Sequence, residues 1–80
     1  MRLDKFLKVS RVIKRRTVAA SACTGGRVLV NGKEAKPACQ LKVGDILTIE
    51  FGSRPLKIRV RELKEAVRKE QAEELYEVIE

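Results

Sequence analysis

A run of interleaved apolar and basic residues starts the chain: Met1-Arg2-Leu3-Asp4-Lys5-Phe6-Leu7-Lys8-Val9-Ser10-Arg11-Val12-Ile13-Lys14-Arg15-Arg16. At about 100° per residue, the first apolar side chains share one helical face, namely those of Leu3, Phe6 and Leu7. Val9 and Val12 fall toward the opposite side, so an unbroken helix would expose one of the two groups. We therefore predict a short helix, a break near residues 9–11 and then a second helix.

The same stretch carries seven Lys or Arg and one acidic residue, Asp4. A solvated charged face is the plain alternative, but a single acid cannot balance seven cations through helical ion pairs. A cationic wall on a small domain suits a polyanion such as an RNA backbone. We expect Asp4 to favour the helix start or to orient a neighbouring Arg. The candidate RNA-binding residues are Arg2, Lys5, Lys8, Arg11, Lys14, Arg15, Arg16, Thr17 and Lys33.

The second helix is predicted over residues 17–24, with Thr17 as the N-cap. Gly25-Gly26 would end it, because glycine readily adopts the backbone conformation found just after a helix. Asn31-Gly32 then predicts a two-residue β-hairpin turn. The turn alone explains this pair, although Lys33 at the tip would also suit a phosphate contact.

Two later segments alternate with the period of a β-strand, at residues 46–51 and 56–61. Their inward sets are predicted to be Leu47, Ile49 and Phe51 in the first, and Leu56, Ile58 and Val60 in the second. The outward row of the second contains Lys57, Arg59 and Arg61. We favour an edge strand protected by charge over a second RNA surface. The fold class is therefore α+β, with two short helices on a small antiparallel sheet.

The last part of the chain differs in charge from the rest. Residues 1–61 hold fifteen Lys or Arg and four Asp or Glu, a net charge of +11, whereas residues 62–80 hold three and seven, a net charge of −4. An apolar stripe and the Glu65–Lys69 spacing predict a helix over residues 62–79. We divide the chain into an RNA-binding domain, residues 1–61, and an acidic C-terminal helix, residues 62–80, that packs on it or extends it.

Composition excludes several classes of protein. Eighty residues with three aromatic side chains suit one domain with a modest core and no deep catalytic pocket. The two cysteines, Cys23 and Cys39, have no His partners, so an ordinary zinc site is excluded and both are expected in the core. No catalytic motif, signal peptide or membrane-length apolar run is present. We expect a cytoplasmic protein without enzymatic activity, cofactor, metal or membrane partner, and a monomer.

Four blocks in order resemble the S4 RNA-binding domain family: Arg2-Leu3-Asp4-Lys5-Phe6-Leu7, Lys14-Arg15-Arg16-Thr17-x-Ala19, Gly26-Arg27-Val28-x-Val30-Asn31-Gly32-Lys33 and Val43-Gly44-Asp45-x-Leu47. Nearly the whole chain also looks like a bacterial branch of this family that acts in ribosome-associated quality control. The resemblance implies binding to large-subunit rRNA and peptidyl-tRNA beside other quality-control factors. There the protein would position the tRNA while a C-terminal tail is added to the stalled nascent chain.

Two other functions remain open from the residues. An S4-type module can regulate through a different structured RNA, and the acidic segment 62–80 can serve a protein-interaction adaptor. A DNA-binding helix-turn-helix fits less well, because a hairpin follows the second helix. Deleting the acidic segment would separate an adaptor from an RNA-binding protein.

Overall fold

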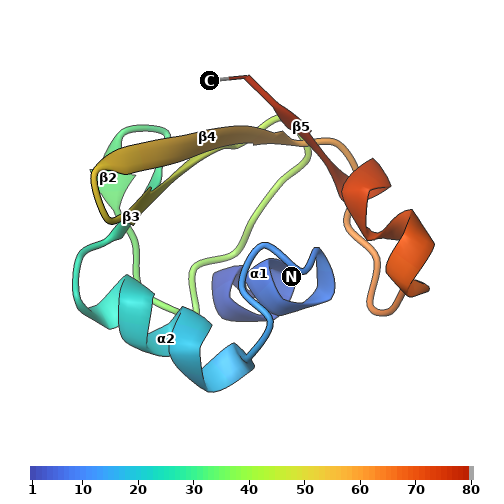
Figure 1. Cartoon of the computed structure of the whole chain (residues 1–80), viewed down its shortest axis with the longest axis horizontal. Helices are drawn as coiled ribbons and strands as arrows, with labels where there is room; N and C mark the ends of the chain where they lie inside the picture. The colour runs from blue at the N-terminus through green and yellow to red at the C-terminus, as the bar shows by residue number, and fades with distance from the viewer. Residues whose placement is uncertain (80) are drawn as a thin grey trace.

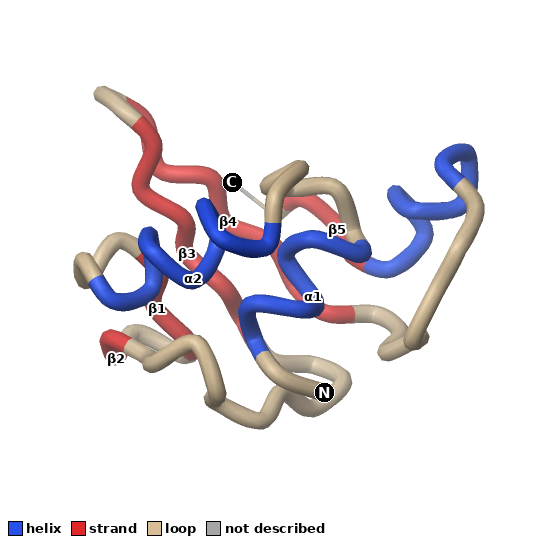
Figure 2. The backbone as a smooth tube through the Cα atoms, turned by 90° about the horizontal axis from the view of Figure 1, so that it is seen from below, coloured by secondary structure: helices blue, strands red, loops and turns tan. Residues whose placement is uncertain are grey.

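A five-stranded antiparallel sheet with two helices on one face makes up the protein (Figures 1 and 2). The computed structural model describes residues 1–79, apart from the side chain of Phe51. Its elements are α1 (Leu3–Val9), α2 (Arg16–Thr24), β1 (Val28–Val30), β2 (Lys33–Glu34), β3 (Ile46–Phe51), β4 (Arg54–Val60), the 3-10 helix η1 (Lys69–Leu75) and β5 (Tyr76–Val78). The strand order is β2-β1-β3-β4-β5. The α+β prediction is confirmed.

The core lies between the two helices and the covered face of the sheet. From α1 and α2 it takes Leu3, Phe6, Leu7, Ala19 and Cys23, and from the strands Val28, Leu47, Ile49, Ile58 and Val60. The alternation in β3 and β4 placed these strand residues correctly, while the prediction for Phe51 concerns a side chain outside the described part. Each fully buried Leu, Ile or Phe contributes roughly 1.5–3 kcal/mol.

The break in the first segment and the turns after it follow the sequence signals. α1 ends at Val9 and α2 begins at Arg16, which confirms the helix–break–helix prediction. After α2, the amide of Arg27 donates to the carbonyl of Ala22, and Gly26 has φ 76°, so the helix ends in a Schellman motif. Asn31 and Gly32 have φ 52° and 85°, as a tight hairpin turn of two residues requires.

Thr17 is not the N-cap that we predicted. The helix begins one residue earlier, Arg15 takes the cap position in an extended conformation, and no side chain caps the helix. Thr17 is exposed in the first turn instead. The geometry of the preceding connector thus decides where α2 begins, rather than the capping preference of threonine.

The predicted helix over residues 62–79 is wrong within the part that the structure describes, which excludes Glu80. Residues 61–68 run without a helix, η1 is a short 3-10 helix, and β5 pairs with β4. The amide of Arg61 donates to the carbonyl of Leu75 at 2.8 Å, and that of Ile79 to the carbonyl of Lys57 at 2.9 Å. A continuous helix would leave these backbone groups of β4 unpaired, so sheet formation overrides the local helical pattern.

β5 also overturns the interpretation of β4 as an edge strand. It covers the outer edge of β4, and the row Lys57, Arg59 and Arg61 therefore does not protect a free edge. Arg59 Nη1 lies 3.2 Å from Glu77 Oε1 on β5. The acidic segment thus joins residues 1–61 as a strand of the same sheet.

Candidate nucleic-acid interface

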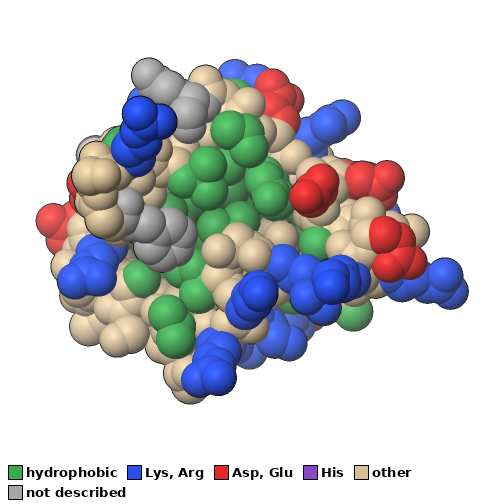
Figure 3. All heavy atoms as spheres, in the orientation of Figure 1, with side chains coloured by type: hydrophobic (Ala, Val, Ile, Leu, Met, Phe, Trp, Pro, Cys, Tyr) green, Lys and Arg blue, Asp and Glu red, His purple; other side chains and the backbone are tan. Residues whose placement is uncertain are grey.

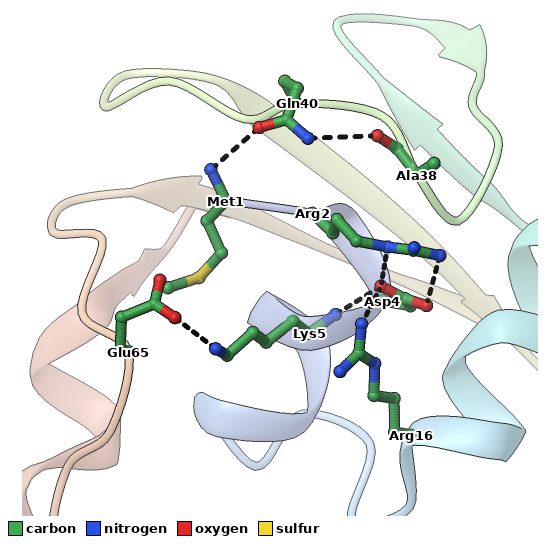
Figure 4. A network of polar contacts seen from close by, with 8 residues as sticks. All are labelled: Met1, Arg2, Asp4, Lys5, Arg16, Ala38, Gln40 and Glu65. Atoms are coloured by element: carbon green, nitrogen blue, oxygen red, sulfur yellow. Dashed lines mark hydrogen bonds and ion pairs between the residues drawn. The ribbon is translucent and has the colours of Figure 1, made fainter.

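Asp4 holds two arginines from different parts of the chain. Arg2 donates from Nε and Nη2 to Asp4 Oδ1 and Oδ2, each at 3.2 Å, and Arg16 Nη2 donates to Oδ1 at 3.5 Å (Figure 4). The amide of Lys5 also donates to Oδ1, at 2.8 Å. The carboxylate therefore fixes the side chains of Arg2 and Arg16 side by side at the start of the two helices.

Burial makes this arrangement electrostatically strong. The side chain of Asp4 is 5% exposed, whereas those of Arg2 and Arg16 are 48% and 45% exposed. Burial by itself raises the pKa of Asp4, but the hydrogen bonds and charges of the two arginines outweigh it, so the pKa lies below its usual value. Asp4 is thus an ionised anchor whose two guanidinium partners still reach solvent.

Backbone contacts fix the first turn of α1 against the segment before β3. The amide of Leu3 donates to the carbonyl of Cys39 at 2.8 Å, and that of Asp4 to the carbonyl of Pro37 at 3.1 Å. The amide of Leu41 in turn donates to the carbonyl of Met1 at 2.9 Å. Backbone bonds on both sides of Arg2 therefore form a clamp, which fixes the position of the main chain from which its side chain extends.

The connector between α1 and α2 places more cations on the surface. Ser10 is buried, and its hydroxyl donates to the carbonyl of Leu7. Arg11 has φ 62°, in the left-handed region that residues other than glycine seldom occupy. This turn directs the chain from α1 into α2 and leaves the side chain of Arg11 exposed.

The structure brings most of the predicted RNA-binding residues onto one region. Arg2 and Arg16 meet at Asp4, and a shallow groove is lined by Lys8, Arg11 and Lys14. Arg15 and Thr17 are exposed at the start of α2. Lys33 is exposed on β2, at the edge of the sheet opposite β5, and no contact among the described residues links it to the helical cations.

Glu65 is a residue of this region that the sequence did not reveal. Its carboxylate pairs with the side chain of Lys5 (Figure 4), and Glu65 also lines the groove. The predicted pairing of Glu65 with Lys69 by helical spacing is wrong, because residues 61–68 form no helix. A contact between residues sixty positions apart leaves no local signal in a single sequence.

Charge is segregated over the surface. Figure 3 shows Lys and Arg side chains gathered along the lower part of the view, over α1, α2 and their connector, and acidic side chains over η1. Within residues 1–79, four exposed cations of the helical region have no acidic partner: Lys8, Arg11, Lys14 and Arg15. The region can therefore bind a polyanion without first breaking internal ion pairs at those four positions.

Residues 1–79 show no group of three or more His, Cys, Asp or Glu side chains placed to hold a metal ion. None of the helices in this range is long and apolar enough to cross a membrane. Cys23 is buried in the core, as predicted, whereas Cys39 is half-buried, and both are free thiols.

Comparisons with known proteins identify similar chains over nearly the full length. The S4 domain family model matches residues 1–47. The RQC P-site tRNA stabilizing factor of Halalkalibacterium halodurans is 55% identical over 78 residues, which cover 98% of this chain and 89% of the relative. The protein of the same name from Bacillus subtilis is 48% identical, and the match covers 99% of this chain and 92% of that one.

Two solved structures share the fold. Heat Shock Protein 15 of Vibrio cholerae, described as trimeric, superimposes with a TM-score of 0.92 at 31% identity, covering 99% of this chain and 81% of the other. The solution structure of the hypothetical protein HP1423 gives a TM-score of 0.84 at 26% identity, with coverage of 100% and 98%. The strand β5 and the segment before it thus belong to the shared fold.

Proposed function

The chain belongs to the S4 domain family and, within it, to the RQC P-site tRNA stabilizing factors (RqcP), and from this premise we propose how it acts. It is an RNA-binding protein of bacterial ribosome-associated quality control. It binds the large ribosomal subunit through rRNA and holds peptidyl-tRNA in place while the stalled nascent chain receives its C-terminal tail.

The cationic region organised by Asp4 is the observation that carries this function. Arg2 and Arg16 are aligned before RNA arrives, and the four unpaired cations extend the region across the connector between α1 and α2. Guanidinium groups suit phosphate oxygens because they donate two parallel hydrogen bonds. Little side-chain freedom is then left to lose on binding, which favours affinity.

The mechanism is positional and involves no bond making or breaking by this chain. Release of counterions from RNA supplies the affinity, and the fixed shape of the two helices selects a structured RNA.

We place the protein in the cytoplasm with the ribosome, beside other quality-control factors. Lys33 on the β1–β2 hairpin and Thr17 on α2 are proposed as additional phosphate contacts. A protein-interaction adaptor that uses one continuous helix over residues 62–80 is less well supported, because residues 62–79 form the short helix η1 and the strand β5 instead.

Co-sedimentation with ribosomal fractions tests this function. A C-terminally tagged protein is applied to intact ribosomes, free subunits and large subunits that carry peptidyl-tRNA. We expect enrichment on the last fraction and its loss in the Arg2→Ala/Arg16→Ala double variant. The control is the Arg27→Ala/Arg54→Ala double variant. It removes two exposed cations, one just before β1 and one at the start of β4, and leaves the contacts of Asp4 unchanged.

Equal weak binding to every fraction would contradict the role on stalled subunits and leave a generic RNA-binding protein. Loss of binding in the control double variant would show that net charge matters more than placement. The monomeric state that we propose is tested separately by light scattering during size-exclusion chromatography, since the similar Vibrio cholerae protein is described as trimeric.

A further inference from the structure

A groove opens between the end of α1 with its connector and the segment before η1. It has a volume of about 310 Å³, and its walls are formed by Lys8, Val9, Arg11, Lys14, Glu65, Ala66 and Val67. The two sides come from segments more than fifty residues apart in the sequence. The acidic C-terminal segment thus supplies one whole wall of a cavity whose other wall is cationic.

The two walls differ in the chemistry that they offer. Lys8, Arg11 and Lys14 are exposed cations, suited to a phosphate group. Val9 and Val67 are half-buried and pack against the core, which gives the groove an apolar floor. Glu65 adds a single carboxylate, so a purely anionic ligand would meet repulsion at that side.

Lys5 fixes the carboxylate of Glu65 in this wall. The hydrogen bond from the Lys5 ammonium and its charge lower the pKa of Glu65, so the group is ionised at neutral pH. An ionised carboxylate only accepts hydrogen bonds. A ligand that matches the groove therefore combines a negative group for the cations, an apolar part for Val9 and Val67, and hydrogen-bond donors for Glu65.

A ribonucleotide with an unpaired base has these three parts. The groove volume of about 310 Å³ lies at the low end of the range of about 300–1,000 Å³ for small-ligand sites, which suits a single nucleotide. Unstacked bases are the usual targets of sequence-specific RNA recognition, because their Watson–Crick edges are free. We propose that this groove binds a single unpaired guanine nucleotide of RNA, with its phosphate on the cations and its base edge on Glu65.

Guanine fits the carboxylate better than uracil does. Its Watson–Crick edge offers two adjacent donors, N1–H and the N2 amino group, which match the two oxygens of Glu65, because Oε1 keeps a second lone pair after it accepts from Lys5. Uracil has one donor between two carbonyl oxygens, and these would face the negative charge. The inference rests on the proposed function, because it names a nucleotide that the RNA-binding region selects.

Titration of the full chain with mononucleotides tests the proposal by NMR. Guanosine 5′-monophosphate is expected to shift the amide resonances of Val9, Ala66 and Val67 and to bind about fivefold more tightly than uridine 5′-monophosphate. Inorganic phosphate alone should shift the connector amides around Arg11 but not those of Ala66 and Val67. Glu65→Gln should lower the affinity for guanosine 5′-monophosphate to that for uridine 5′-monophosphate. Glu62→Gln, which changes an exposed acid outside the groove, should leave the preference for guanosine 5′-monophosphate intact.

Equal affinity for the two nucleotides would overturn the proposal. Amide shifts with guanosine 5′-monophosphate that are no larger than those with inorganic phosphate would overturn it as well. A guanosine preference that survives Glu65→Gln would overturn it as well. If the wild-type protein still sediments with peptidyl-tRNA-bearing large subunits in that case, the groove assignment fails while the proposed function stands. If the wild-type protein binds guanosine 5′-monophosphate as expected but does not sediment with those subunits, the proposed function is contradicted and the groove assignment stands.

Discussion

Arg16 Nη2 lies 3.5 Å from Asp4 Oδ1 although the two residues are twelve positions apart along the chain. The contact exists because α1 and α2 pack against each other and present their first turns on the same side. Asp4 receives Arg2 as well, so one buried carboxylate organises both arginines. The stability of the fold and the shape of the cationic region are therefore coupled through one residue.

Replacing Asp4 with asparagine should weaken both properties. Asp4→Asn removes the charge that Arg2 and Arg16 face, and a buried charged hydrogen-bond network of this kind costs about 1–3 kcal/mol to break. We expect a lower urea midpoint with an unchanged slope, and weaker binding to large subunits although the net positive charge rises. Glu50→Gln, at an exposed strand position, serves as the control and should change neither.

Acid should destabilise the wild type more than the Asp4→Asn variant. The pKa of Asp4 is lowered in the folded state, so its contribution is fully present above the unfolded pKa of about 3.9 and is lost as the pH falls through the lower folded value. Urea midpoints at pH 6 and pH 2.5 measure the loss. An identical decrease of the urea midpoint in the two proteins would show that Asp4 does not contribute to the loss of stability at low pH.

Arg11→Gly should separate RNA binding from folding. Arg11 occupies a left-handed backbone conformation, which glycine adopts without strain, so the free energy of unfolding should change by less than about 1 kcal/mol. Removal of the exposed guanidinium should still lower the affinity for RNA. Thermal unfolding and RNA binding measured on the same sample check both parts, and a large loss of stability would contradict the structural role given to this turn.

Salt should weaken RNA binding steeply. If five phosphates are contacted by Arg16 and the four unpaired cations, the slope of log K against log salt is roughly −3.5 to −4.5. Arg16→Ala should reduce the magnitude of this slope by about one, whereas Arg54→Ala on β4 should leave it unchanged. A slope near zero in the wild type would exclude counterion release as the source of affinity.

The two thiols should react at different rates. Burial, with smaller contributions from the nearby Asp4 and Cys39, raises the pKa of Cys23 to about 11, so about one thiol in a thousand is ionised at pH 8. A thiol reagent in native buffer should therefore modify half-buried Cys39 first and Cys23 only on unfolding. Cys39→Ser should remove the early phase of thiol modification. Modification of both thiols at equal rates in the native protein would contradict the buried position of Cys23.

Local patterns predicted most of the elements in the first sixty residues, although they did not reveal that β5 covers the edge of β4. The change of apolar face after Leu7, the Gly25-Gly26 pair and Asn31-Gly32 each act within a few residues, and the structure has the expected helices and hairpin there. Asp4 was expected to orient an arginine, and it orients two. The one-residue error at Thr17 arises because the connector, rather than a capping side chain, starts α2.

Long-range contacts account for what could not be predicted. Residues 62–79 have helical composition, but β5 pairs with β4 and satisfies backbone groups along the outer edge of β4, which a separate helix would leave without a partner strand. Glu65 therefore does not lie one helical turn from Lys69, and its side chain pairs with Lys5 instead. The two residues are too far apart in the sequence for their contact to be inferred from periodicity, and the groove that Glu65 lines with residues of α1 and the connector could not be predicted for the same reason.

The clamp on the first turn of α1 sets the order in which a growing chain can fold. Met1 meets Gln40, thirty-nine residues later, and Lys5 meets Glu65, sixty residues later. Contacts of such sequence separation form slowly, since much of the chain must close before any of them is made. The first turn of α1 therefore cannot complete its contacts until residues 37–41 have been synthesised, and Lys5 cannot meet Glu65 until still later in synthesis.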